Sequence, residues 1–170
     1  GNSTYLSALA IQKNKEQDPD YTCEFTAIEP YPNKVLQDGF PNLSNLIKEP
    51  VQNVPLSTFE KLGENDILFI DSSHVLKVGN DVQYEYNEIL PRLNRGVLIH
   101  IHDIFLPCEY PRKWICQKHL FWTGTISPTG ISDLQLCVQS GLGWPLYAQE
   151  PPRTPRESVQ DIRPRICSAR

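Results

Sequence analysis

Two short apolar runs, each ending at a carboxylate, dominate the hydrophobic pattern of the chain. The first covers residues 66–71, the second covers residues 96–103, and residues 82–90 between them carry apolar or aromatic side chains at an amphipathic helical spacing. Unbroken apolar runs of this length are typical of strands that are buried on both faces of a parallel sheet. The pattern therefore predicts two buried strands separated by a helix that Pro91 ends.

The remainder of the first 123 residues alternates between helical and strand patterns. Ser3 and Thr4 are candidate caps of the first helix, and Gly39 is a candidate stop of the second. The order αβαβαβαβ, with connections short enough for right-handed crossovers, predicts half or more of a doubly wound, Rossmann-like α/β domain with a mostly parallel sheet. The predicted helices cover residues 5–15, 33–38, 56–62 and 82–90, and the predicted strands cover residues 23–29, 46–47, 66–71 and 96–103.

The character of the sequence changes after Trp122. All eight lysines lie at or before Lys118, whereas five of the eight arginines and four of the fifteen prolines lie in the last 20 residues. No helical or strand period continues there, and this composition is typical of an irregular or disordered tail. We therefore predict a partial domain over residues 1–123 and an irregular tail over residues 124–170.

A further hypothesis for the tail follows from the genetic code. With codons chosen freely among synonyms, a reading that starts one base later at Gly124 encodes Glu-Gln-Tyr-Leu-Leu-Gln-Ala-Phe-Leu, an amphipathic aromatic helix. The hypothesis is that the chain from about Gly124 is out of frame through one surplus base near Thr123. Nucleotide reads across this position are expected to show that base, and reads without it would contradict the hypothesis.

The composition excludes several classes of protein. At 170 residues the chain can bury one domain core. Its formal net charge of −4 gives no electrostatic footprint for nucleic acid or an anionic membrane, and no apolar run approaches the roughly 20 residues that span a bilayer. Five irregularly spaced cysteines favour a reducing cytoplasm over a disulfide framework. A chain that contains no methionine and begins at Gly1 is expected to be a fragment.

The candidate chemistry lies where the two strongest strands end. Asp71 and Asp103 close these strands, with His74 and His102 beside them, and ligands of open α/β sheets bind beyond the carboxyl ends of the strands. These carboxylates, with His102, could hold a hard divalent ion or orient a substrate hydroxyl without a metal. The alternative for Asp71 is a helix cap. His100, deeper in its strand, is predicted to be a core histidine with its hydrogen bonds satisfied.

The start of the chain adds a candidate nucleoside site. Residues 1–4 place a glycine turn directly before a helix, and the positive end of a helix dipole suits a phosphate or a carboxylate. Glu29 ends the next predicted strand, roughly 28 residues beyond the turn, where an acidic residue can accept hydrogen bonds from ribose hydroxyls. A simple cap and an exposed charge are the alternatives. Together, the turn and Glu29 favour a nucleoside ligand.

With these residues assembled, the chain resembles a class I S-adenosylmethionine-dependent methyltransferase, and in particular the family labelled Methyltransferase domain 24. The resemblance covers about residues 1–123, and the shifted reading of the tail resembles the next helix of that family. The motifs that carry it are Gly1-Asn-Ser-Thr4, Ile28-Glu29-Pro30, Val51-Gln52-Asn53-Val54-Pro55, Phe69-Ile-Asp-Ser-Ser-His74 and His102-Asp-Ile-Phe-Leu-Pro-Cys-Glu-Tyr-Pro111. The first strand of the family, with its acidic residue, would precede Gly1, and its absence is expected to leave an exposed sheet edge.

The resemblance implies a role for each matching position. S-adenosylmethionine would be bound by the first turn, by Glu29 at the ribose and by the segment that borders the adenine; these cofactor-binding positions are Gly1, Asn2, Ser3, Thr4, Glu29, Val51, Gln52 and Asp71. A divalent cation such as magnesium would be held by Asp71, His102 and Asp103. The implied catalytic residues are Asp71, His74, His102 and Asp103, which would act on a small-molecule acceptor.

Three functions remain open from the sequence. A methyltransferase is favoured, and O-methylation is favoured over N-methylation because carboxylates, rather than an apolar cage, surround the inferred site. An NAD-type enzyme would share the turn and the acidic ribose ligand, but it needs a second nucleotide-binding half, for which no second glycine turn follows a strand. The third is an inactive, non-enzymatic fragment of a methyltransferase domain.

Overall fold

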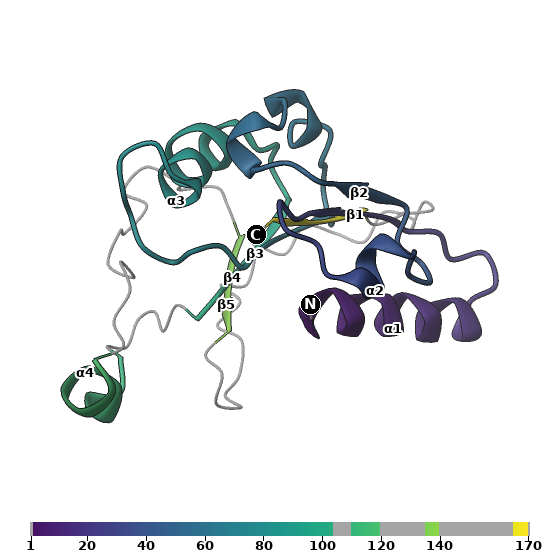
Figure 1. Ribbon diagram of the computed structural model, residues 1–170. Helices are drawn as coiled ribbons and strands as arrows, with labels where there is room; N and C mark the ends of the chain where they lie inside the picture. The colour runs from purple at the N-terminus through teal and green to yellow at the C-terminus, as the bar shows by residue number, and fades with distance from the viewer. Residues whose placement is uncertain (1, 104–109, 120–134, 140–164, 170) are drawn as a thin grey trace, which may run out of the picture.

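The computed structural model describes residues 2–103, 110–119, 135–139 and 165–169. These residues form an α/β structure around a six-stranded sheet in the order β2-β1-β6-β3-β4-β5, in which each neighbouring pair of strands is parallel (Figure 1). The strands are β1 (Glu24–Ile28), β2 (Asn45–Ile47), β3 (Ile67–Ile70), β4 (Leu98–His102), β5 (Gln135–Gln139) and β6 (Arg165–Ala169).

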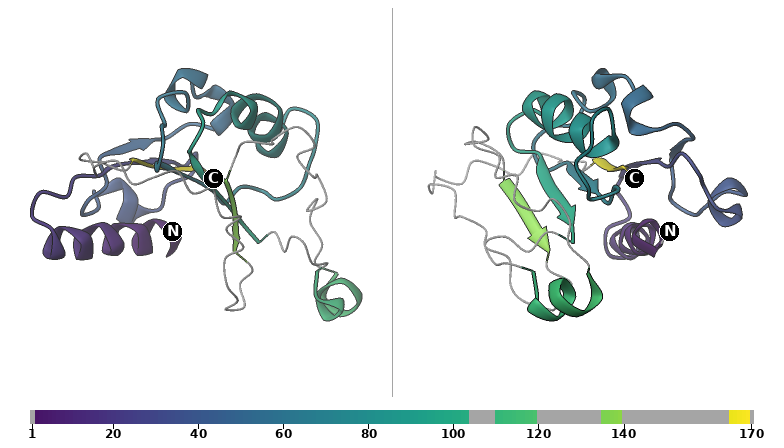
Figure 2. Two further views of the ribbon diagram at one scale, coloured as in Figure 1. Left: turned by 180° about the vertical axis from the view of Figure 1, so that it is seen from behind. Right: turned by 60° about the vertical axis from the view of Figure 1, so that its left-hand side comes forward.

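Helical segments lie on both sides of the sheet. In Figures 1 and 2, α1 and α2 lie below β1 and β2, whereas α3 lies above the sheet. No helix in the described part of the chain has the length and apolar character that a membrane span needs. The helices are α1 (Asn2–Gln17), α2 (Lys34–Gln37), α3 (Asp81–Tyr84) and α4 (Arg112–Lys118), with 3-10 turns at Val51–Asn53, Leu56–Thr58 and Leu90–Arg92 and a π-helical turn at Glu85–Ile89.

The two strongest predicted strands are confirmed as β3 and β4, but each is fully buried on one face only. Leu68 and Ile70 of β3, with Ile99 and Ile101 of β4, belong to the main core. The alternate residues of both strands are half-buried, so burial follows the period of two of a strand. The prediction of burial on both faces was therefore wrong, because the large core cluster packs against one face of this strand pair.

A smaller core lies between α1 and β1. It consists of Ala8 and Ile11 from the helix and Phe25 from the strand. The helix starts at Asn2 and runs to Gln17. Ser3 and Thr4 therefore lie inside its first turn, and the prediction that they cap the helix was wrong. This places the side chains of Ser3 and Thr4 against the protein, where Thr4 is buried.

Two segments of the tail form strands, which corrects the prediction of an irregular tail at those positions. β5 pairs with β4, and β6 lies between β1 and β3 and pairs with both. The predicted exposed edge beside the central strands is therefore covered. Parallel pairing uses backbone groups that every sequence offers, so these strands need no alternating side-chain pattern. The rest of the tail lies outside the described residues, and the reading-frame hypothesis stays a prediction.

The helix predicted over residues 82–90 is observed as a continuous helical segment of mixed type. It begins as α3 at Asp81, with the Asn80 side chain accepting a hydrogen bond from Gln83 N at 3.1 Å. It then passes through the π-helical turn and ends in a 3-10 turn that contains Pro91. A π-helical turn inside a helix is uncommon and is often found at functional sites.

The turn into β4 generates a testable prediction about stability. Gly96 has a φ of +88°, and a Cβ there would lie 3.0 Å from the Glu64 Cα and closer still to the Glu64 side chain. Gly39 has a φ of +97°, with nothing within 4 Å of the Cβ position, and serves as the control. We expect Gly39→Ala to lower the free energy of unfolding by about 1–2 kcal/mol from backbone strain alone. Gly96→Ala should cost about 2–4 kcal/mol, because overpacking adds to that strain. Urea unfolding of both variants measures the difference, and equal costs would contradict the packing argument.

Candidate active site

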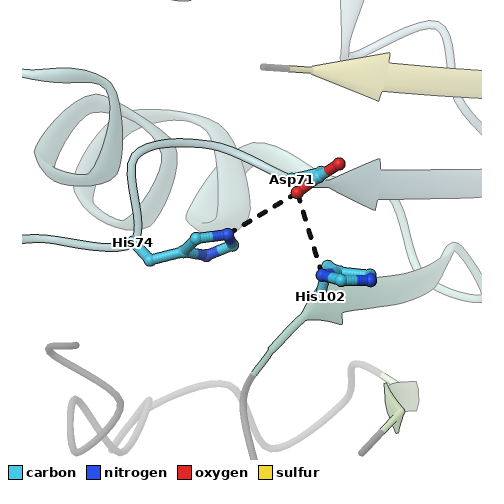
Figure 3. Close-up of side chains that lie close together, drawn as sticks. All are labelled: Asp71, His74 and His102. Carbon is cyan, nitrogen blue, oxygen red and sulfur yellow. Dashed lines mark ion pairs between the residues drawn. The ribbon is translucent and has the colours of Figure 1, made fainter. Parts of the chain in front are cut away.

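Three of the predicted side chains converge beyond the carboxyl ends of β3 and β4. Asp71 follows β3 directly, His102 is the last residue of β4, and His74 lies on the loop after Asp71. Their potential ligand atoms all lie within 4.8 Å of one another. Figure 3 shows both imidazoles directed at the Asp71 carboxylate. The structure thus brings together Asp71, His74 and His102 at the edge where a ligand site was predicted.

The Asp71 carboxylate lies between the two imidazoles. His74 Nε2 is 3.5 Å and His102 Nδ1 is 3.8 Å from the same Asp71 Oδ1 atom. These separations exceed the range of about 2.7–3.2 Å for a good hydrogen bond. The side chains of Asp71 and His74 are 16% and 12% exposed, whereas that of His102 is 42% exposed. A ligand could therefore reach the cluster most readily from the His102 side.

Asp103 lies next to this cluster but is not one of its three members. Its Oδ1 is 3.1 Å from His102 Nδ1, and its backbone has a φ of +58°. Tyr110 donates a hydrogen bond from its hydroxyl to the Asp103 carbonyl at 3.2 Å. Burial, together with the Asp103 charge, raises the pKa of Tyr110. Among the predicted catalytic residues, Asp103 therefore contacts His102, while His74 contacts Asp71.

The loop that carries His74 is held by hydrogen bonds to the following helical segment. Ser72 donates to Glu85 Oε2 at 2.8 Å, and Ser73 donates to Asp81 from both its backbone nitrogen and its hydroxyl, at 2.8 and 2.7 Å. His74 itself has a φ of +59°, a region that non-glycine residues rarely adopt. No helix starts at Asp71, so the alternative reading of this residue as a helix cap was wrong.

The first turn of α1 reaches the same site. Ser3 Oγ donates a hydrogen bond of 3.4 Å to Asp71 Oδ2. The start of the first helix and the end of β3, both predicted to bind the cofactor, therefore lie in contact. Gly1 lies outside the described residues, and the structure does not describe the side chain of Asn2.

The other predicted cofactor-binding residues lie at separate places. Glu29 follows β1, and its carboxylate accepts a hydrogen bond from Tyr31 N at 3.2 Å. Val51 is completely buried in the main core. Gln52 is half-buried and donates from its side chain to the Gly79 carbonyl at 3.3 Å.

His100 differs from its predicted role as a satisfied core histidine. It is half-buried, and its Nε2 atom is buried without a hydrogen-bond partner. Its ring lies 4.6 Å from that of Phe69 and is stacked 6.5 Å from that of His102. Burial and the neighbouring His102 lower the pKa of His100. The neutral ring of His100 thus lies beside those of Phe69 and His102 on the half-buried face of the sheet, next to the site.

The donor atoms of the cluster do not fit magnesium, the cation that the resemblance implies. Mg²⁺ requires near-octahedral oxygen ligands at about 2.0–2.1 Å. The converging set offers two imidazole nitrogens and one carboxylate. The third predicted ligand, Asp103, is outside that set. The structure therefore does not support the magnesium prediction.

Glu85 is a residue near the site that the sequence analysis missed. It is completely buried, and its Oε1 atom has no hydrogen-bond partner. Burial is the main cause that raises the pKa of its carboxyl to about 8. The charge of Asp81 also raises this pKa, whereas the hydrogen bond from Ser72 lowers it. Its burial could have been predicted from the sequence. Glu85 lies three residues after Val82 and four before Ile89, a spacing that places it on the apolar face of the helix.

The parallel sheet defines an α/β domain, and the cluster lies beyond the carboxyl ends of β3 and β4, where open α/β sheets bind their ligands. Residues 1–104 match the family described as Methyltransferase domain, so the chain belongs to this family and carries a class I methyltransferase-like domain. This confirms the resemblance and supports methyl transfer in general.

A curated relative and the solved structures add little to this assignment. An uncharacterized protein of Archaeoglobus fulgidus is 43% identical over 67 residues, which are 38% of this chain and 30% of that protein. The chain thus spans less than a third of the length of that relative. No solved structure matches the chain.

The buried Glu85 predicts an unusual pH dependence of stability. Because its pKa is higher in the folded protein than in the unfolded chain, the folded state holds the extra proton between about pH 4.5 and 8. Its contribution to stability therefore falls as the pH rises through this window. The side chain of Glu85→Gln cannot ionise, so the free energy of unfolding of this variant does not fall with pH in the same way. The free energy of unfolding of the variant minus that of the parent should therefore be higher at pH 7 than at pH 4, by on the order of 3 kcal/mol.

Urea unfolding at several pH values measures this difference. The matched control is Glu88→Gln, on the same helical segment, because Glu88 is 44% exposed and pairs with Arg92 at 2.8 Å. The control should show a small difference that changes little with pH. If the difference in the free energy of unfolding between the parent and Glu85→Gln does not change with pH, Glu85 is ionised in the folded protein and the prediction is wrong.

Proposed function

We propose that the chain is an S-adenosylmethionine-dependent methyltransferase that acts on the hydroxyl of a small molecule. The observation that carries this proposal is the contact between Ser3, in the first turn of α1, and Asp71, at the end of β3. A helix start suited to the carboxylate of the methyl donor and a cluster of proton-accepting side chains thus share one place. Family membership supports the methyl-transfer part.

The sheet order supports a cofactor that reaches from Glu29 to the cluster. β1 and β3 are separated by one strand, β6, so their carboxyl ends lie about 10 Å apart. An extended nucleoside with a methionine substituent can bridge this separation. In the proposed arrangement, Glu29 accepts hydrogen bonds from the ribose hydroxyls and the first turn of α1 receives the methionine carboxylate.

The side chains of the cluster can perform the proton transfer that O-methylation needs. Methyl transfer is an in-line displacement at the sulfonium methyl, and alignment of the two reactants supplies much of the acceleration. His74 or His102 would take the proton of the acceptor hydroxyl as a general base. Asp71 Oδ1, within 4 Å of both imidazoles, would orient the histidine that acts. Asp103 would orient His102.

The proposal predicts binding of S-adenosylhomocysteine, measured by calorimetric titration of the whole 170-residue chain. Glu29→Gln should weaken this binding about 10- to 100-fold, because it replaces the charged acceptor of the ribose hydroxyls with a neutral amide. Glu24→Gln is the matched control, since Glu24 begins the same strand at its opposite end. The control should bind like the parent. Absence of binding by the parent would favour the inactive-fragment alternative.

The same preparation tests the type of acceptor. When it is incubated with methyl-labelled S-adenosylmethionine and a panel of small hydroxyl and amine compounds, mass spectrometry should find the label in methyl ethers. Label confined to methylamines would contradict O-methylation and leave methyl transfer intact.

A further inference from the structure

We propose that Asp71, His74 and His102 form a binding site for a borderline divalent transition-metal ion, such as Zn²⁺ or Co²⁺, that discriminates against Mg²⁺. The donor set is two imidazole nitrogens and one carboxylate, all within 4.8 Å of one another. Imidazole suits Zn²⁺, Co²⁺ and related ions, whereas Mg²⁺ prefers oxygen ligands. Three protein ligands with an open fourth position are common in zinc sites that exchange a water or a substrate.

The spacing of the donor atoms fits a shared ion better than it fits direct hydrogen bonds. A tetrahedral ion bonded at about 2.1 Å keeps its ligand atoms about 3.4 Å apart. The distances from Asp71 Oδ1 to His74 Nε2 and to His102 Nδ1 are 3.5 and 3.8 Å. Small side-chain movements would therefore bring all three atoms into the first shell of one ion (Figure 3).

An unsatisfied nitrogen supports the same assignment. His102 Nδ1 is buried without a hydrogen-bond partner, although Asp103 Oδ1 lies 3.1 Å away. A buried polar atom without a partner calls for an explanation, and ligation of an ion is one of the established ones. A metal bond to Nδ1 would satisfy this atom, while Asp103 would remain beside the occupied site.

Metal binding would also regulate the proposed reaction. Ligation uses the nitrogen lone pair that a general base uses to take a proton, so a bound ion and proton transfer by the same imidazole exclude one another. This consequence rests on the proposed methyl transfer, whereas the metal site does not. The test therefore contains neither methyl donor nor acceptor.

Titration of the whole chain with Co²⁺ tests the site, since bound Co²⁺ gives visible ligand-field absorption that reports its ligands. We expect saturable binding at one equivalent, and at least tenfold weaker binding in His74→Asn and in His102→Asn. His119→Asn is the matched control, because His119 is exposed at the end of α4 and should not change binding. Zn²⁺ should displace the Co²⁺, following the order of metal affinities, whereas excess Mg²⁺ should not.

A measurement on the unmodified chain removes the dependence on variant folding. Zn²⁺ should protect His74 and His102, but not His119, from diethylpyrocarbonate, with the modified peptides identified by mass spectrometry. Equal modification of His74 and His102 with and without Zn²⁺, or displacement of Co²⁺ by Mg²⁺, would overturn the proposal.

Discussion

The parallel register between β3 and β4 is the constraint on which the site depends. Ile70 pairs with Ile101, so the residues that follow them, Asp71 just after β3 and His102 at the end of β4, lie side by side. A shift of one residue in either strand would turn its side chains to the opposite face and would separate the carboxylate from the imidazole. The main core fixes this register, because Ile70 and Ile101 are both buried in it.

The same alternation divides the strand pair into a structural face and a chemical face. Residues of one parity pack in the main core, whereas Phe69, His100 and His102 share the half-buried opposite face and lie within ring-contact distances of one another. Asp71 has the parity of Phe69, so it continues this face beyond the end of β3. The cluster is therefore accessible because it belongs to the face that the main core does not cover.

The sequence was sufficient to predict the two strands, β3 and β4, at whose ends Asp71 and His102 lie, since a short apolar run that ends in a polar residue is typical of a buried strand of an α/β sheet. It could not predict that His74, rather than Asp103, joins the converging set, because both residues have left-handed backbone, for which the sequence carries no signal at non-glycine positions. Nor could it predict β6, whose pairing relies on backbone groups that carry no side-chain signal. The burial of Glu85 could have been predicted, because its helical spacing alone places its carboxylate on a buried face.

Two different kinds of interaction maintain the two halves of the cluster. Asp71 and His102 are placed by backbone pairing and core packing, which are distributed over many residues. His74 instead depends on a short loop with a left-handed residue, and strain of this kind persists only where the surroundings over-determine it. The hydrogen bonds from Ser72 to Glu85 and from Ser73 to Asp81 supply that restraint. Glu85, whose ionisation lowers stability at neutral pH, thus accepts a hydrogen bond from the loop that carries His74, which is the part of the site that strand pairing does not position.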